Sequence, residues 1–290
     1  MRDDFAVFIL THGRPDNIKT IAALKASGYT GRTYLVIDDL DESGPQYYQR
    51  YPGQVLEFSK PEIEPTLDLY DQGGDHRTIT YARNACWKLA EQIGVRYFVE
   101  LDDDYGWFGY RTVGKHDPQQ SRPSVHGWKI RNLDVCWSRM VDFLDESHAL
   151  TVAMSQGGDH MGGELGWRPQ LKRKAMNSFV CDVERRFEWV GRMNEDVNTY
   201  TSGSRRGEMF FTYTPLQLNQ TETQSQQGGI TELYVSRGTY QKAFMSVMAT
   251  PSAVHVSSLG RINHRLHHKI DWNACAPKIL RQQRRRRRRT

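Results

Sequence analysis

The sequence predicts an α/β protein in which a mostly parallel central sheet is flanked by helices, in a single domain with a disordered basic C-terminal tail. Two short apolar runs, Phe5–Leu10 and Thr33–Ile37, enclose a stretch with helical spacing, which is the pattern of a β-α-β unit. Because such crossovers are right-handed, we expect the two strands to be parallel. A third apolar run, Val95–Leu101, follows an amphipathic helix and extends the same sheet.

The composition favours a soluble, cytoplasmic protein with no membrane partner. In 290 residues no apolar run approaches the roughly 18 residues that a membrane span needs. The first seven residues also lack the basic-then-apolar pattern of a secretion signal. The cysteines have no paired spacing, which predicts reduced thiols rather than a zinc site or a disulfide framework; they are Cys86, Cys136, Cys181 and Cys275.

The positive net charge belongs to the C-terminal tail. Residues 281–290 hold seven arginines and no acid, so subtracting them from the net charge of +5 leaves −2 for the body. The run from Arg284 to Arg289 cannot pack into a core, which predicts a disordered segment that attracts polyanions. It is interpreted as a nucleic-acid tether, with a merely solubilising or vestigial tail as the alternative.

Polar residues follow the first two predicted strands. The first strand leads into Thr11 and Arg14, and Pro15 suits the first turn of the helix that ends near Gly28. A hydroxyl and a guanidinium in this position can bind a diphosphate. The second strand ends in Asp38 and Asp39, either of which can accept a hydrogen bond from a base or ribose. Alone, Arg14 and Asp39 would be interpreted as surface cap and turn residues.

A further strand is expected at Val55–Phe58, and a helix at Thr78–Ile93 with Gly94 as its stop. Arg83 lies outside the apolar stripe of this helix, near its positive N-terminal half. There it can reach a ligand at the sheet edge. The alternative for Arg83 is an ordinary pair with a surface acid.

Three consecutive carboxylates, Asp102, Asp103 and Asp104, end the strand that begins at Val95. Neighbouring like charges resist ionising together unless a cation lies between them. Oxygen ligands favour Mg²⁺ or Mn²⁺ over zinc. Alternation along an extended chain makes Asp102 and Asp104 the predicted metal pair, with Asp103 turned away. A solvated acidic turn is the alternative.

The second half of the chain is less regular. Residues Trp107–Trp128 are interpreted as a long loop, and a helix is expected at Val135–Leu144. A strand is expected at Ala149–Met154, and the glycine-rich stretch Gln156–Trp167 suits a wall that closes around a substrate. An apolar strand at Met209–Tyr213 and a helix with an apolar stripe near residues 240–248 complete the expected elements.

This ordered set of motifs resembles the nucleotide-sugar glycosyltransferases of the GT-A fold over about residues 5–200. The motifs are Thr11–Pro15, Asp38–Asp39, Ala82–Asn84 and Leu101–Asp104. More narrowly, the chain is similar to the TET-associated glycosyltransferases of phages and bacteria, which act on hydroxymethylated pyrimidines in DNA. The narrower resemblance also rests on His267–Trp272 and Pro277–Leu280.

The resemblance implies a metal-dependent enzyme that uses Mn²⁺ or Mg²⁺ and a UDP-sugar, with UDP-glucose as the expected donor. It implies a glycosyltransferase domain at 1–280, with a nucleotide-binding half at 1–104 and an acceptor half at 105–280. Six residues would bind the nucleotide: Thr11, Arg14, Asp38, Asp39, Arg83 and Asp103. Asp102 and Asp104 would bind the metal, completed by His268 or its neighbour His267, and a basic surface with Arg261, Arg265 and Lys269 is the competing interpretation of these histidines.

Asn194-Glu195-Asp196 stands at the head of a predicted helix, where acids are usually caps. Inverting GT-A enzymes carry a Glu-Asp pair in such a place. The resemblance therefore makes Asp196 the expected general base, with Glu195 as the alternative, and hydroxymethylated duplex DNA the expected acceptor. Other functions stay open: transfer to a saccharide or protein, a metal-dependent nuclease or phosphoryl-transfer enzyme, and a non-catalytic DNA-binding module.

Overall fold

The structure is a computed structural model that describes residues 1–71, 76–113, 125–156, 178–220, 230–259 and 265–275. Several predicted features lie outside the described residues. These are the arginine-rich tail, Arg261, the 277–280 motif, and all but the first residue of the glycine-rich stretch at 156–167.

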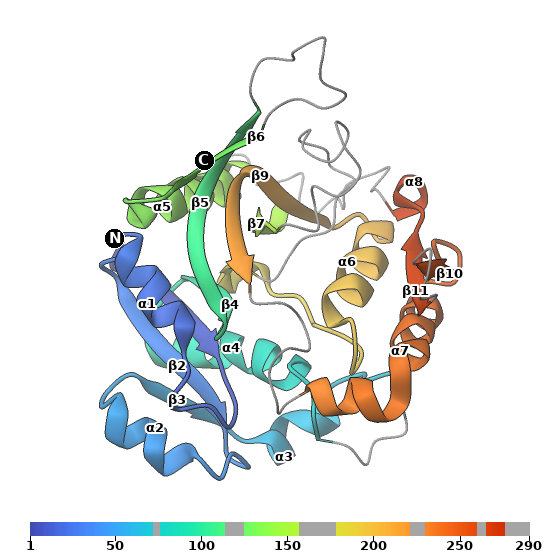
Figure 1. Cartoon of the computed structure of the whole chain (residues 1–290), viewed down its shortest axis with the longest axis horizontal. Coiled ribbons are helices and arrows are strands. Elements are labelled where there is room, and N and C mark those ends of the chain that lie inside the picture. The colour runs from blue at the N-terminus through green and yellow to red at the C-terminus, as the bar shows by residue number, and fades with distance from the viewer. Residues whose placement is uncertain (72–75, 114–124, 157–177, 221–229, 260–264, 276–290) are drawn as a thin grey trace.

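The N-terminal half is a parallel α/β unit, as predicted (Figure 1). Strand β1 (Phe5–Leu10) is buried along its whole length and pairs with β2 (Arg32–Asp38) on one side and β4 (Tyr97–Asp102) on the other, both in parallel. Strand β3 (Val55–Phe58) adds to β2, also in parallel. This unit places the C-terminal ends of four strands at one edge of the sheet.

Helices connect these strands at the expected places. Helix α1 (Lys19–Ala26) joins β1 to β2, and α2 (Gly44–Arg50) precedes β3. A short helix α3 (Lys60–Ile63) leads through a 3-10 turn, Glu64–Thr66, toward α4 (Thr80–Gln92). The helix predicted at Thr78–Ile93 is therefore confirmed, and Gly94, with a φ of +67°, ends it as expected.

The prediction of a long loop at Trp107–Trp128 is wrong for the described part of this stretch. Its described residues belong to two antiparallel strands, β5 (Tyr105–Val113) and β6 (Val125–Lys129). Gly109, one of the glycines in this stretch, has a packing role. A Cβ atom at Gly109 would lie 2.4 Å from the Trp107 ring and 2.9 Å from the carbonyl oxygen of Trp128, so only glycine fits between them.

The second half adds helices and mostly antiparallel strands. In chain order it contains α5 (Leu133–Glu146), β7 (Ala149–Ser155), β8 (Ser178–Asp182), a 3-10 turn Val183–Arg185, α6 (Glu195–Arg205), β9 (Met209–Gln220), α7 (Ile230–Ala249), β10 (Val254–Leu259), β11 (Arg265–Ile270) and α8 (Trp272–Cys275). The predicted helix at Val135–Leu144 and strand at Ala149–Met154 are confirmed. In Figure 1, α7 and the β10–β11 hairpin lie beyond α6, on its side away from the sheet.

The described strands form one large sheet in the order β3-β2-β1-β4-β8-β7-β9-β5-β6, and β10 and β11 pair separately. The sheet is parallel from β3 to β4 and mixed beyond β4, where β8 runs antiparallel to both of its neighbours. Helices pack on both of its faces, so the predicted α/β class with a central sheet flanked by helices is confirmed.

Two hydrophobic cores lie on opposite faces of this sheet. Alternate residues of β1 divide between them: Phe5, Val7 and Ile9 pack with α1 and α5, whereas Ala6, Phe8 and Leu10 pack with α4 and α6. The four cysteines are free and buried, as predicted. No helix in the described parts of the chain is both long and apolar enough to cross a membrane.

Candidate active site

The candidate site lies where β1, β2 and β4 end. Leu10 of β1 is paired with Val36 of β2 and with Asp102 of β4, so the residues that follow these strands lie side by side. Ligands of open α/β sheets bind at such an edge, beyond the carboxyl ends of the strands. The predicted residues Thr11, Asp38 and Asp102 are therefore brought to one region by strand pairing alone.

Asp103 faces the loop that follows β1. Its carboxylate accepts a 2.8 Å hydrogen bond from Thr11 Oγ1 and a 3.2 Å hydrogen bond from Arg14 Nη1. Tyr47 of α2 orders the same loop, because its hydroxyl lies 3.0 Å from Thr11 Oγ1 and accepts from the Arg14 amide at 2.8 Å. Burial raises the pKa of Asp103, and the contacts with Arg14 and Thr11 oppose that shift. Three predicted nucleotide-binding residues thus form one connected group.

Asp38 and Asp39 lie in different environments. Asp38 is buried and accepts hydrogen bonds from Lys60 Nζ at 3.0 Å and His12 Nδ1 at 2.8 Å. Burial alone would raise the pKa of Asp38, but the contacts with His12 and Lys60 leave it below its usual value. Asp39 is exposed, and its Oδ1 accepts from the Lys60 amide at 2.9 Å. Sequence reasoning missed Lys60 and His12, because neither stands out beside the acids they bind.

Asp102 and Asp104 share a hydrogen-bond partner that does not contact Asp103. Gln220, the last residue of β9, donates a 3.1 Å hydrogen bond from Nε2 to Asp102 Oδ2, and it also hydrogen-bonds Asp104. Asp102 and Asp104 therefore contact the same residue of β9, whereas Asp103 contacts the loop that follows β1. Burial is the main cause that raises the pKa of Asp102 to about 7, and burial together with Asp103 raises that of Asp104.

This pair fits a hard divalent cation. Mg²⁺ in proteins is commonly bound by one or two carboxylates together with phosphate oxygens of the substrate, and Mn²⁺ accepts the same oxygen ligands. Among the described residues, no group of three or more His, Cys, Asp and Glu side chains is placed to hold a metal.

His267 and His268 lie on β11 with their rings stacked at a centroid distance of 4.2 Å. His268 Nδ1 lies 3.2 Å from Asn194 Nδ2, next to the head of α6. The structure therefore associates His268 with the Asn194-Glu195-Asp196 segment. Its role as a metal ligand stays a prediction.

Arg83 lies in the interior, with only 1% of its side chain exposed. Its guanidinium donates to three carboxylates: Nε to Glu195 at 3.0 Å, Nη1 to Glu100 at 3.1 Å and Nη2 to Asp102 at 3.4 Å. The alternative of a surface ion pair is therefore wrong. Its partners come from β4 and α6, so Arg83 holds the end of the strand to the head of the helix.

Glu100 completes this cluster, and sequence reasoning missed it. The side chain is fully buried, and burial raises its pKa to about 8 even though Arg83 opposes the shift. The only signal in the sequence was one acid inside an otherwise apolar strand. A buried carboxylate needs a cationic partner, and that partner proves to be Arg83, 17 residues earlier.

The head of α6 is fixed by Asn194. This residue has a left-handed backbone (φ +55°), and its Nδ2 donates at 3.0 Å to both Lys242 O and Ser246 Oγ of α7. Glu195 and Asp196 follow in the first turn and are both buried. Burial raises the pKa of Glu195, and Arg83 opposes that rise. Asp196 Oδ1 accepts a 2.8 Å hydrogen bond from the Val197 amide.

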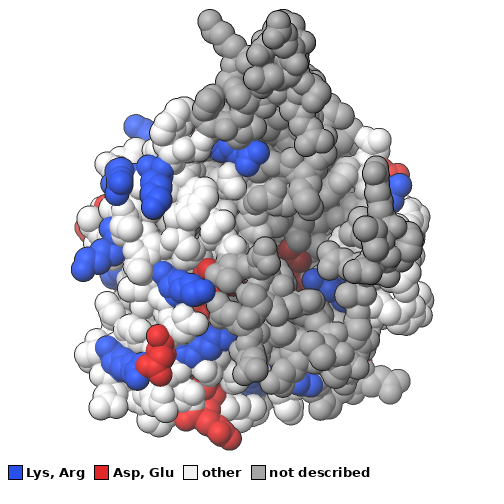
Figure 2. All heavy atoms as spheres, viewed as in Figure 1, with Lys and Arg blue, Asp and Glu red and all other residues white. Residues whose placement is uncertain are grey.

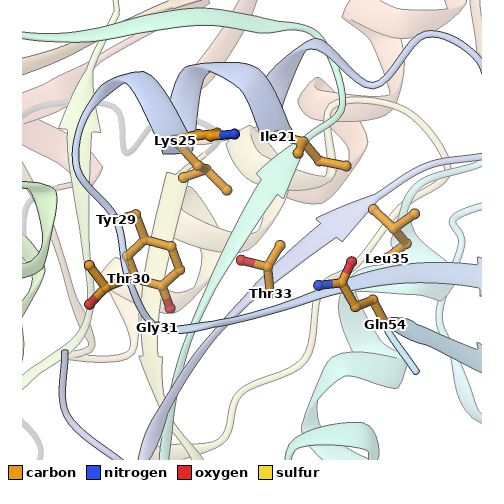
Figure 3. A pocket seen from close by; sticks show the side chains of 9 residues that line it. Ile21, Lys25, Tyr29, Thr30, Gly31, Thr33, Leu35 and Gln54 are labelled. Carbon is orange, nitrogen blue, oxygen red and sulfur yellow. The ribbon is translucent and has the colours of Figure 1, made fainter. Parts of the chain in front are cut away.

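A cavity of about 180 Å³ elsewhere in the fold contains none of these residues (Figure 3). It opens between α1 and β2, where Ile21, Lys25 and Thr33 contribute to its walls. The candidate active site is defined by the converging acids and Arg83 rather than by this cavity.

One family model matches most of the chain. The family described as TET-associated glycosyltransferase matches residues 5–229. No curated protein matches the chain significantly.

Among solved structures, two of glucosyl-3-phosphoglycerate synthase from Mycobacterium tuberculosis are similar. One is in complex with Mg²⁺ and UDP (13% identity, 92% of this chain and 88% of that chain, TM-score 0.44), and the other with Mn²⁺ and UDP-glucose (13%, 92% and 87%, TM-score 0.45). TarS residues 1–349 from S. aureus is also similar (13%, 76% and 61%, TM-score 0.40). Because the family match spans most of the chain, this protein belongs to the TET-associated glycosyltransferases and is a glycosyltransferase.

Proposed function

We propose that this protein transfers a sugar from a UDP-sugar, with UDP-glucose as the first donor to test, to the hydroxymethyl group of a 5-hydroxymethylpyrimidine in DNA. The observation that carries the proposal is the group of carboxylates at the end of β4, joined through Arg83 to the acids at the head of α6. In this arrangement a diphosphate bound at the acidic turn would lie near a base at the head of α6. Family membership supports glycosyl transfer over the nuclease alternative.

Asp102 and Asp104 would hold Mn²⁺ or Mg²⁺. When bound there, the metal supplies positive charge that stabilises the diphosphate as the glycosidic bond breaks. Two features of the chain support this assignment. The two carboxylates share Gln220, and burial holds the pKa of both above the usual range, so a cation between them relieves an unfavourable accumulation of charge.

Thr11, Arg14 and Asp103 would bind the nucleotide from the other side of the acidic turn. Arg14 is partly exposed, so its guanidinium can reach a phosphate while one nitrogen stays 3.2 Å from Asp103. Asp39, which is exposed at the end of β2, would accept a hydrogen bond from the base or ribose. Asp38 is held by His12 and Lys60 and would orient them toward the nucleotide.

Asp196 would act as general base. It would take the proton from the acceptor hydroxyl as that oxygen attacks the anomeric carbon opposite the diphosphate, which inverts the configuration. Glu195 is a poorer candidate because its carboxylate is tied to Arg83 at 3.0 Å, and a positive partner stabilises the charged form that would have to accept a proton. We assign Glu195 to positioning the helix head.

The acceptor hydroxyl of a 5-hydroxymethylpyrimidine lies in the major groove of duplex DNA. A buried base such as Asp196 would require the nucleotide to rotate out of the helix, as in other enzymes that modify bases. The cost of unpairing is a few kcal/mol, which contacts between the protein and the DNA backbone must offset.

The test is transfer itself. Full-length protein is incubated with UDP-glucose and Mn²⁺ and with duplexes that contain 5-hydroxymethylcytosine, 5-hydroxymethyluracil or no modified base. Mass spectrometry of the digested DNA then detects an added hexose. We expect addition only on a hydroxymethylated duplex, and none with Asp196→Asn or in chelator. Transfer to a saccharide or protein instead, or cleavage of the DNA, would refute the proposed acceptor or reaction.

A further inference from the structure

Positive charge is concentrated in three segments beside the candidate site. Residues 19–33, 105–113 and 125–133 hold six Lys and Arg and no Asp or Glu. The body without its arginine tail has a charge of −2, so the remainder of the body has −8. The first segment lies more than 70 residues before the other two in the sequence.

The fold brings these segments together. The Leu133 amide donates to Ser27 O at 2.9 Å, and a Cβ atom at Gly28 would lie 2.2 Å from Arg131 O, so the end of α1 touches the chain that leaves β6. Lys129 of β6 is paired with Gly109 of β5. Figure 2 shows Lys and Arg atoms spread over the side of the molecule on which Figure 1 draws α1 and β5.

Four of these cations are exposed: Lys19 and Lys25 of α1, Lys129 of β6, and Arg131 just after it. We call these four residues the basic face. Solvent-exposed ammonium and guanidinium groups keep their counterions until a polyanion replaces them, which is the main source of affinity in non-specific DNA binding.

The basic face begins at the acidic turn. Thr20, in the first turn of α1, donates to Asp102 O at 2.6 Å and accepts from the Tyr105 amide at 3.0 Å. Helix α1 and strand β5 thus start together beside the predicted metal pair and run outward from it. At a rise of about 3.3 Å per residue, β5 extends roughly 20 Å from Tyr105 to Arg111, which matches about six base pairs along the axis of a DNA duplex.

We propose that the basic face binds the phosphate backbone of the acceptor DNA and holds the duplex beside the acidic turn while one nucleotide enters the site. The proposal rests on the proposed function for the identity of the polymer. A surface of exposed cations is complementary in charge to the phosphates of a nucleic acid and not to an apolar partner. The carboxylates of the site repel phosphates, so the backbone is bound beside them and only the target nucleotide approaches Asp196.

The test is a triple variant of the full chain, Lys25→Glu, Lys129→Glu and Arg131→Glu. Its matched control is Lys88→Glu, an exposed residue of α4 on the opposite face of the sheet, whose partner Glu62 is 3.8 Å away and equally exposed. Melting temperatures of both variants are measured first, and we expect both to stay near that of the wild type because surface substitutions change stability little.

Fluorescence anisotropy then gives the Kd for a duplex at several salt concentrations. We expect the triple variant to bind roughly tenfold or more weakly at low salt. Its plot of log affinity against log salt should flatten by about 0.9 for each lost phosphate contact. The control should match the wild type. Transfer to free 5-hydroxymethyl nucleoside should be unchanged in both variants, because neither alters the site.

The outcomes separate the two proposals. If the triple variant binds DNA with the affinity and salt slope of the wild type, or if Lys88→Glu weakens binding equally, the basic face is not the DNA surface, whatever the wild type glycosylates. If the wild type transfers no sugar to hydroxymethylated DNA, the proposed acceptor is wrong. If the triple variant nevertheless binds DNA more weakly than the wild type, the basic face is still the DNA-binding surface.

Discussion

Arg83 Nε lies 3.0 Å from Glu195 Oε1, which joins helix α4 to the head of α6, 112 residues later. The same guanidinium binds Glu100 and Asp102 of β4. One cation thus fixes the predicted metal strand relative to the predicted base. Arg83 was predicted to bind the nucleotide, and from these contacts we instead expect it to influence the reaction through its partners.

Replacing Arg83 with Met should be strongly destabilising. Removing one partner of a buried ion pair costs about 3–5 kcal/mol because the other charge stays buried without compensation. Chemical denaturation measures the loss. The control is Arg139→Met on α5, whose exposed ion pair with Asp142 should contribute about 0–1 kcal/mol. Equal losses for the two variants would contradict the importance of the cluster.

Arg83→Lys should keep more of the stability but lower kcat, since one ammonium cannot reach three carboxylates in fixed directions.

Asp102→Asn and Asp104→Asn should each abolish the effect of metal on donor binding. The measurement is the rise in melting temperature with UDP plus Mn²⁺ over Mn²⁺ alone, because a ligand that binds only the folded state stabilises it. Asp142→Asn, a half-buried acid on α5 away from the acidic turn, is the control and should keep the full shift. If Asp102→Asn or Asp104→Asn keeps its transfer activity in the presence of a chelator, these residues do not bind a catalytic metal.

Asp196→Asn should keep donor binding and lose transfer. The loss of a general base lowers the chemical step by about 10²–10⁴-fold, whereas UDP-sugar affinity should change little. Glu195→Gln should instead lower stability as well, because it weakens the contact with Arg83. If Asp196→Asn lowers donor affinity and kcat by the same factor, the residue is a structural cap of α6.

Glu100 should make the protein less stable as pH rises. Its pKa is raised from 4.5 to about 8, so between these values the folded protein holds a proton that the unfolded chain has released. The free energy of unfolding therefore falls with increasing pH across that window, and the fall ends above pH 8. Glu100→Gln stays neutral throughout, so denaturation at pH 5 and pH 8 should show a smaller difference for this variant than for the wild type. A difference as large as that of the wild type would show that another group titrates.

The features that sequence reasoning found are those that depend on neighbours along the chain. Apolar runs and helix stops predicted β1, α4 and β4, and the alternation of an extended chain predicted that Asp102 and Asp104 point away from Asp103. The features it missed depend on contacts across the fold. Gln220 contacts Asp102 from 118 residues away. Glu100 is an acid in an apolar strand, and only the folded structure shows that Arg83 compensates its charge. The β5–β6 hairpin was missed because Gly109 reads as a turn residue, although its missing side chain makes room for Trp107.

The Arg83 cluster also constrains how this protein can evolve. Its four side chains come from α4, β4 and α6, and Arg83 and Glu100 are too deeply buried for water to replace a partner lost from that pair. A lineage that loses the arginine must therefore neutralise Glu100 in the same step or close to it, for example by exchanging both for apolar residues of similar volume. Among homologous sequences, positions 83, 100 and 195 should accordingly vary as a linked set, and intermediates with only one exchange should be rare.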